Sequence, residues 1–280
     1  MTAAPPQHDP AGTGTLTYLL RQRFSYHYDN PVRDLRHRLV VIPPARHGAQ
    51  RRRRHSITVS AAARTTHRRD AAGNTVTRAH VPLVPAVIDF DVEVVVDAVG
   101  PHTDALLPAA ALTDPRLLQP TRLTTADAAI RDLAATLAGP DRLASADRFC
   151  AYVHDAISYA HDVTTVETTA AEALAGGRGV CQDSAHLMLA LCRAAGLPAR
   201  YVSGHLLGEG GTHAWVEAVV ADPAGARAVA FDPCNGRRAG RDYLTIATGR
   251  DYTDVAPTSG TYCGTARGTL TATKQLRTSG

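Results

Sequence analysis

The sequence predicts an α+β protein in which a β-rich, sandwich-like N-terminal region precedes a core of helices followed by an antiparallel sheet. Short β-like runs separated by turn residues fill the first hundred positions, as in antiparallel sandwiches. From about residue 125 apolar residues recur at helical spacing, and strand-like runs follow the helices. Helices first and strands after them indicate the segregated layers of an α+β core.

The N-terminal strands are expected in five runs, which span residues 16–26, 35–42, 55–60, 75–79 and 90–97. Pro43 and Pro44 end the second run, because proline has no N–H to donate to a ladder. The segment 70–74, Asp-Ala-Ala-Gly-Asn, is a turn that returns the chain into the fourth run. Residues 1–14 are rich in Ala, Pro and Gly and are expected to be disordered.

Three helices are expected in the middle of the chain. The first runs from a cap at Thr125 to Gly139, the second carries apolar residues between 149 and 157, and the third runs from near Cys181 to Gly196. Strands are expected to follow at residues 200–207, 213–220 and 227–232. The predicted division is therefore a disordered segment 1–14, a β-rich domain 15–118, and a catalytic core with C-terminal strands 119–280.

Composition excludes several classes of protein. The 280 residues are 44% apolar and 20% charged, which is ordinary for a globular chain. The N-terminus lacks the pattern of a signal peptide, and no apolar run is long enough to span a membrane. Five cysteines without a C-x-x-C pair argue against a disulfide framework. We therefore expect a soluble, cytoplasmic protein without membrane partners.

Basic residues give weak support for a nucleic-acid partner. The net charge is only +4, and Lys274 is the single lysine, so arginine carries almost all the positive charge. The run Arg51–Arg54 has no interleaved aromatic residues and no recognition helix after it. A solvated arginine edge that discourages strand aggregation is the preferred interpretation, and no nucleic acid is expected as a partner.

Three segments carry the chemistry. The first, residues 177–186, reads Gly-Arg-Gly-Val-Cys-Gln-Asp-Ser-Ala-His and places Cys181 where an apolar helix begins. The unpaired N–H groups and the positive dipole at a helix start favour a thiolate, which is the nucleophilic form of cysteine. The same N–H groups could stabilise an oxyanion on a substrate carbonyl.

The second and third segments supply a base and its partner. His213 opens a predicted strand after a glycine-rich turn, and Asp232 ends the next strand. If those strands pair antiparallel, the carboxylate orients the imidazole and the imidazole accepts the thiol proton. Cys181, His213 and Asp232 are therefore the candidate catalytic residues.

Together the three segments resemble the transglutaminase-like superfamily, in its bacterial branch with a β-rich N-terminal region. Cys181 in Gly-Val-Cys-Gln-Asp, His213 in Thr-His-Ala-Trp-Val and Asp232 in Phe-Asp-Pro match the family's Cys, His and Asp. The turn 70–74 and the tail 249–257 also resemble that branch, so the resemblance runs from about Leu16 to the end. It implies a papain-like core. Cys234 departs from the pattern, because threonine is expected after Asp-Pro.

The resemblance implies acyl transfer through a thioester on the cysteine, from a peptide, amide or ester substrate. Water as acceptor gives hydrolysis, which we favour, and an amine acceptor gives a new amide. A non-catalytic peptide-binding module on the same fold is the alternative. No cofactor and no metal are expected, because Cys181, His186 and Cys192 lack metal-like spacing. The oligomeric state, the substrate and the pathway are not predicted.

Five further residues are candidates for supporting the site. Tyr159 could donate to an oxyanion, Gln182 follows the nucleophile, and Asp183 is a carboxylate in the first helical turn. Trp215 shares a strand face with His213 and could shield it, although core packing is its more ordinary role. His186 lies five positions after Cys181 and so on another helix face, where packing or hydrogen bonding is the more ordinary role.

Overall fold

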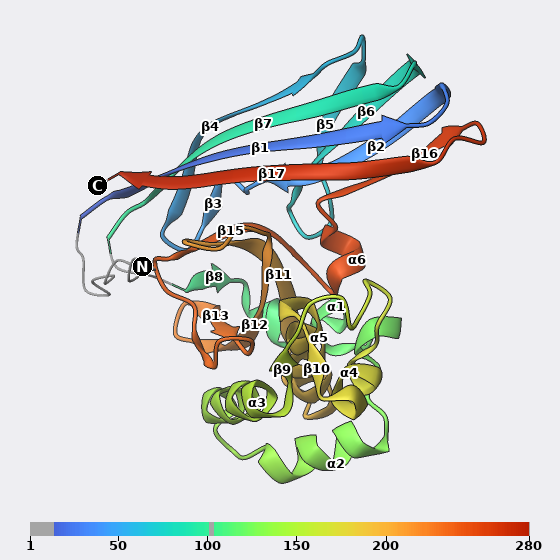
Figure 1. Ribbon diagram of the computed structural model, residues 1–280. Helices are drawn as coiled ribbons and strands as arrows, with labels where there is room; N and C mark the ends of the chain where they lie inside the picture. Colours follow the sequence, from blue (N-terminus) through green and yellow to red (C-terminus); the bar gives the residue numbers. More distant parts are fainter. Residues whose placement is uncertain (1–13, 101–103, 280) are drawn as a thin grey trace, which may run out of the picture.

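Two antiparallel sheets lie face to face in the N-terminal part of the molecule (Figure 1). The computed structural model of the chain describes residues 14–100 and 104–279, so the predicted disordered segment lies outside it apart from Gly14. One sheet has the order β17 (Gly268–Ser279), β1 (Leu16–Tyr28), β7 (Val87–Ala98), β4 (Gln50–Val59) and β3 (Arg46–His47). The other has the order β16 (Thr258–Cys263), β2 (Val32–Ile42), β6 (Thr75–Val84) and β5 (Arg64–Arg69).

Alternation of side chains builds the core between these sheets. Phe90 of β7 is fully buried, and its ring stacks on His37 of β2 with 4.5 Å between centroids. Tyr26 of β1 packs edge-on against the same histidine at 4.8 Å. The turn before β6 forms as expected, with Gly73 in the left-handed region at φ 85° and Asp70 accepting from the backbone N–H of Asn74.

Helices and a third antiparallel sheet form the other part of the molecule (Figure 1). The sheet has the order β14 (Arg237–Arg238), β13 (Gly225–Asp232), β12 (His213–Asp222), β11 (Ala199–Leu206) and β15 (Tyr243–Gly249), with β8 (Ala105–Leu107) also paired to β13. The helices are α1 (Pro115–Leu118), α2 (Ala128–Leu137), α3 (Arg142–Ala156), α4 (Ala170–Gly176), α5 (Cys181–Ala194) and α6 (Tyr252–Val255). Short 3₁₀ turns at 109–113 and 122–124 and a parallel bridge of β9 (Ser158–Tyr159) with β10 (Arg178–Gly179) complete the described elements.

Helix α5 is the centre of this part of the fold. Every residue from Gln182 to Arg193 is buried, because α2, α3 and α4 surround the helix and β11 and β12 lie behind it. A helix with that environment must be apolar on all sides, as this one largely is. The one buried guanidinium, Arg193, donates to the carbonyl oxygen of Arg250 at 2.6 Å and to Thr124. Among the described helices, none is both long and apolar enough to cross a membrane.

The α+β fold class is confirmed, and two details differ from expectation. The first helix is capped by Asp127, whose carboxylate accepts from the N–H of Ile130 at 2.9 Å, and not by Thr125, which instead donates to the carbonyl of Thr121.

The strands after the core turn back to the N-terminal part, where β17 pairs with β1 and β16 with β2. Conversely, β8 lies within the predicted N-terminal domain 15–118 but pairs with β13. The predicted domain bounds remain a prediction.

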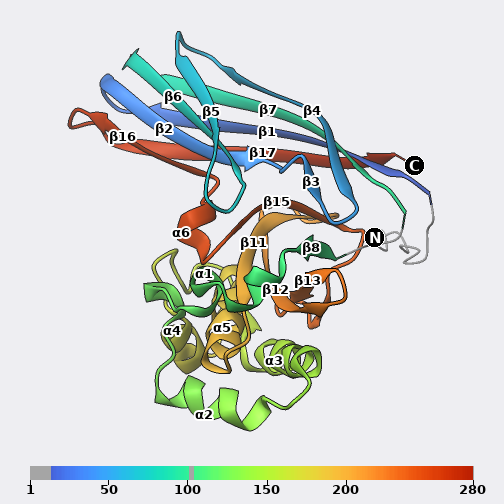
Figure 2. The same cartoon turned by 180° about the vertical axis from the view of Figure 1, so that it is seen from behind.

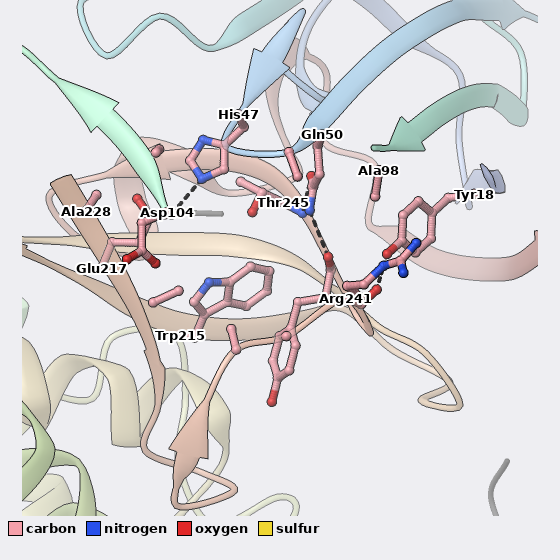
Figure 3. Close-up of a pocket in the computed structure, with 16 residues that line it drawn as sticks. Tyr18, His47, Gln50, Ala98, Asp104, Trp215, Glu217, Ala228, Arg241 and Thr245 are labelled. Atoms are coloured by element: carbon pink, nitrogen blue, oxygen red, sulfur yellow. Dashed lines mark hydrogen bonds and ion pairs between the residues drawn. The ribbon is translucent and has the colours of Figure 1, made fainter. Parts of the chain in front are cut away.

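Side chains from the N-terminal strands hold the two parts together. Asn74 donates to the carbonyl of Thr248 at 2.7 Å and accepts from its N–H at 2.9 Å. Gln50 also bonds the backbone of β15: its amide donates to the carbonyl oxygen of Tyr243 at 2.8 Å and accepts from the N–H of Thr245 at 3.1 Å (Figure 3). Two amide side chains thus satisfy backbone groups on the outer edge of β15, which no strand covers among the described residues.

A buried carboxylate adds an electrostatic contact at the same boundary. Glu217 of β12 lies 2.6 Å from His47 of β3 (Figure 3). Arg200 of β11 lies 2.6 Å from the same carboxylate. Burial raises the pKa of Glu217, but the charges of Arg200 and His47 outweigh that effect and lower it to about 2. Glu217 is therefore ionised and paired on both sides.

Candidate active site

Cys181 is the first residue of α5, as the sequence predicts. Gly177 ends α4 in the left-handed region at φ 62°, and a Cβ on Gly179 would lie 2.6 Å from Asp183 Oδ2. Both glycines are therefore required for the tight approach to the helix. Asp183 closes the turn by accepting from the N–H of Val180 at 2.8 Å. The N–H groups of Asp183 and Ser184 donate to Val180 O, whereas a helix offers no internal acceptor for its earliest N–H groups.

His213 and Asp232 come together at the end of the core sheet. The predicted antiparallel pairing of β12 with β13 is confirmed, and His213 begins β12 where Asp232 ends β13. Their side chains are buried, with 2.7 Å between His213 Nε2 and Asp232 Oδ2. Cys181 lies close enough to His213 for its charge to raise the pKa of the imidazole, and Nδ1 is the ring nitrogen that Asp232 does not engage. Cys181 itself is partly exposed.

Asp232 is held by several donors besides His213. Tyr243 donates its hydroxyl at 2.6 Å, Asn235 donates its side-chain amide at 2.7 Å, and the backbone N–H of Cys234 reaches the other oxygen at 3.0 Å. Burial raises the pKa of Asp232, but the hydrogen bond from His213 and these further bonds outweigh it and keep the pKa below its usual range. The carboxylate is therefore ionised and fixed in place.

The charge of His213 follows from its two partners. Burial lowers the pKa of His213, but the hydrogen bonds and charges of Asp232 and Cys181 outweigh burial and raise it to about 10. The imidazole is thus protonated at neutral pH when its partners are anionic, which stabilises negative charge on the sulfur. A partly exposed sulfur, a cationic imidazole and a helix start together form an arrangement suited to nucleophilic attack on a carbonyl carbon.

Tyr159 and Trp215 flank this arrangement on two sides. Tyr159 pairs with Gly179 in the β9–β10 bridge, close to Cys181 in space, and its side chain is exposed. Trp215 is buried and nearly parallel to the His213 ring, with 6.2 Å between centroids. Its indole is wedged against Gly204, where any Cβ would collide with it. Trp215 therefore both packs in the core and covers one face of the histidine.

The other three candidates lie on α5. Gln182 is buried beside Cys181 in the first turn. Asp183 is buried, accepts from Thr164 Oγ1 at 2.7 Å, and has its pKa raised by burial. His186 is turned away from the sulfur, because its Nε2 accepts from the N–H of Tyr252 at 3.2 Å, and burial lowers its pKa to about 4. It therefore anchors the segment that contains α6.

The remaining cysteines differ from Cys181 in their surroundings. All five are free thiols. Cys150 and Cys192 are buried in the helical core, and burial raises the pKa of each to about 12. Cys234 is partly exposed, and burial together with the charges of Cys181 and Asp232 raises its pKa to about 12. Across residues 14–100 and 104–279, no group of three or more His, Cys, Asp or Glu side chains is placed to hold a metal ion.

Comparison with known proteins bears on the family of the chain. Two family models match, the transglutaminase-like superfamily over residues 131–233 and the bacterial transglutaminase-like N-terminal region over residues 18–97. An uncharacterized protein of Mycobacterium tuberculosis (strain ATCC 25618 / H37Rv) is 30% identical over 280 aligned positions, covering 89% of this chain and 88% of that protein. The chain belongs to the transglutaminase-like superfamily.

Two further relatives extend the comparison of this transglutaminase-like chain. An uncharacterized protein of Mycobacterium leprae (strain TN) is 40% identical over 118 residues, 39% of this chain and 40% of that protein. The match thus spans less than half of that relative. A crystal structure of a protein named "putative cysteine protease" from Cytophaga hutchinsonii has a TM-score of 0.75 at 22% identity, with 95% of this chain and 91% of that chain covered. The last likeness establishes a shared fold.

Two residues that contact the site were not predicted from the sequence. Asn235 follows the Phe-Asp-Pro-Cys segment and could have been suspected, because Asn after a turn readily bonds a nearby carboxylate. Tyr243 lies on β15, and its hydroxyl reaches Asp232 although β11 and β12 separate β15 from β13 in the sheet order. No local pattern indicates that contact, which depends on the order of the strands.

Proposed function

We propose that this protein is a thiol-dependent acyl-transfer enzyme that hydrolyses a peptide or amide bond through a thioester on Cys181. The observation that carries the proposal is the buried, hydrogen-bonded pair of His213 and Asp232 beside the partly exposed sulfur of Cys181, whose charge raises the pKa of His213. A purely structural thiol has no need of a cationic imidazole whose orientation is fixed by a buried carboxylate.

Each step of the proposed reaction uses a group in that series. The sulfur of Cys181 attacks the carbonyl carbon, and first-turn N–H groups of α5 stabilise the oxygen that becomes negative. His213 then gives its proton to the leaving amine as the C–N bond breaks, which leaves a thioester and a neutral imidazole. Water attacks the thioester while His213 removes its proton, and as the C–S bond breaks the acid is released and the thiolate–imidazolium pair is restored. Asp232 holds the imidazole in orientation throughout.

An amine acceptor in place of water is the second candidate reaction. The same three groups support it, and the chain's own composition bears on the acceptor. Lys274 is the only lysine, and its Nζ donates to the carbonyl oxygen of Gly211 at 2.6 Å. An acceptor amine would therefore come from another molecule. A reducing compartment such as the cytoplasm suits this enzyme, because Cys234 carries a second free thiol close to the nucleophile.

Selective labelling and adduct detection test the proposal. Iodoacetamide at neutral pH is expected to alkylate Cys181 faster than any other cysteine, with buried Cys150 as internal reference, and peptide mapping by mass spectrometry reports each rate. Incubation with a peptide and amide library should then give an acyl adduct on intact protein that is absent from Cys181→Ala. Adding methylamine distinguishes hydrolysis from amide formation by the mass of the product. Equal alkylation of Cys181 and Cys150, with no adduct, would refute the proposal.

A further inference from the structure

An arginine-lined cleft separates the N-terminal strands from the core sheet at the end remote from Cys181. Its walls come from β3, β4, β5, the turn before β6, β8, β11, β13 and β15, and Figure 2 shows where these strands lie. Arg227 lines it near the start of β13, five residues before Asp232. At ~3.3 Å per residue along a strand, that separation is about 16 Å. The cleft is thus a site distinct from the thiol centre.

Arginine dominates the charge of the cleft. Five arginines line it against a single acidic residue, Asp104. Buried Glu217, which lies behind the lining, neutralises Arg200 as well. Three positive charges of the lining therefore remain uncompensated. Such a concentration in a concave site raises the local concentration of anions.

Three of these arginines have no carboxylate partner among the described residues. Arg200 is paired with Glu217, and Arg227 with Asp104 at 3.1 Å. Arg46 and Arg69 are exposed, and Arg51 donates only to the carbonyl oxygens of Gly48 and Gln50. Of the other arginines on β4, Arg53 reaches Asp97 and Arg54 reaches Glu93, whereas Arg52 donates to Thr75 Oγ1 and Pro43 O and does not line the cleft. The unpaired guanidinium groups thus face the cleft and can each bind a carboxylate.

An apolar cleft continues from the arginine-lined one. The two share Ala72, Leu107, Arg200 and Thr248 among their lining residues. Small apolar side chains dominate the second cleft, from Ala71, Pro108, Ala110, Ala111, Pro115 and Leu117. Its arginines are largely neutralised, since Arg116 pairs with Asp114 and Arg250 with Asp254. The combined groove is therefore cationic in one half and apolar in the other.

We propose that this groove binds an extended peptide segment that carries several carboxylates next to apolar side chains. Each cleft has a volume of ≈ 1120–1130 Å³, which exceeds the space that a drug-sized ligand needs, so a small anion would leave most of the groove unfilled. Neither cleft is lined by Phe, Tyr or Trp, so the groove lacks the stacking surface of single-stranded nucleic-acid sites. The inference goes beyond the proposed reaction and does not depend on it.

Fluorescence anisotropy with a labelled peptide tests this site. The probes are fluorescein-labelled hexaglutamate and a (Glu-Leu)₃ peptide, each measured on the full chain carrying Cys181→Ala, so that turnover cannot change them. The double variant Arg51→Gln/Arg69→Gln removes two unpaired guanidinium groups. The matched control Arg53→Gln/Arg54→Gln removes the same charge from the neighbouring paired positions. Circular dichroism melts establish that each variant is folded.

Both peptides are expected to bind, with (Glu-Leu)₃ binding more tightly despite its lower charge, because it also fills the apolar half. Arg51→Gln/Arg69→Gln should weaken both by about tenfold or more, while the control changes affinity by less than about threefold. Equal weakening by both double variants would overturn the proposal, since only net charge would then matter. So would tighter binding of a single-stranded DNA hexamer, or complete competition by inorganic phosphate at equal ionic strength.

Discussion

Replacing Asp232 by asparagine isolates the charge that orients the candidate base. The amide keeps the shape of the carboxylate, and its oxygen can still accept from His213 Nε2, which lies 2.7 Å from Oδ2. Without the negative charge of Asp232, less remains to offset the burial of His213, which disfavours its protonated form. We therefore expect the pKa of His213 to fall well below the value of about 10 that it has in the intact site.

The size of the effect follows from the pKa of His213. A rise from 6.5 to about 10 corresponds to ~5 kcal/mol in favour of the imidazolium, at 1.36 kcal/mol for each pKa unit. Asp232 and Cys181 share that stabilisation. If half belongs to Asp232, the substitution lowers the pKa of His213 by about 2 units and slows alkylation of Cys181 at pH 7 by about tenfold to a hundredfold.

The same shift links folding to pH. The folded-state pKa of His213 lies above its unfolded value, so protonation stabilises the folded protein. That contribution is complete below about pH 6.5 and is lost as the pH rises through about 10. In Asp232→Asn the loss is expected to begin at the same pH, because the unfolded-state pKa is unchanged, but to end at a lower pH and to be smaller. Urea unfolding at several pH values between 6 and 10.5 measures this difference.

Histidine-labelled protein gives the direct assay. Heteronuclear NMR follows the titration of His213, and iodoacetamide kinetics follow Cys181 in the same samples. Asp147→Asn is the control, because Asp147 forms an exposed ion pair with Arg238 and neither residue is among the groups that shift the pKa of His213. An unchanged His213 titration in Asp232→Asn, or an equal change in Asp147→Asn, would refute the assigned electrostatics.

Three further predictions use other contacts. Gly204→Ala puts a Cβ into Leu244 O and the Trp215 ring, so we expect a loss of about 3 kcal/mol or more in thermal unfolding, while Gly210→Ala, with open space around it, should change little. Asn74→Ala leaves both backbone groups of Thr248 unpaired and should cost about 2–3 kcal/mol in urea unfolding, against almost nothing for exposed Asn30→Ala. Lys274→Met removes the donor to Gly211 O, two residues before His213. It should speed amide exchange in residues 207–212 and slow Cys181 alkylation by up to about tenfold. Lys274→Arg, which keeps a donor, should restore both rates. Unchanged protection of residues 207–212 from amide exchange in Lys274→Met would contradict the contact.

The sequence predicted those parts of the site that depend on local rules. Glycines followed by an apolar run place Cys181 at a helix start, and two strands joined by a short connection bring His213 to Asp232. Tyr243 was missed because its contact with Asp232 depends on which strand lies beside β11. The cap of α2 was misplaced because Thr125 and Asp127 are both good caps, and only the hydrogen bond to Ile130 decides between them.

The return of β16 and β17 to the N-terminal strands bears on how the polypeptide is made. β7 ends at Ala98 and β16 begins at Thr258, so everything that contains Cys181, His213 and Asp232 is synthesised between two halves of one sandwich. During synthesis on the ribosome, β1 and β2 each have one unpaired edge until β17 and β16 emerge and pair with them. A nascent chain interrupted after α6 would lack both closing strands and Lys274. We therefore expect proteases to degrade chains truncated after α6 before the site around Cys181 can form.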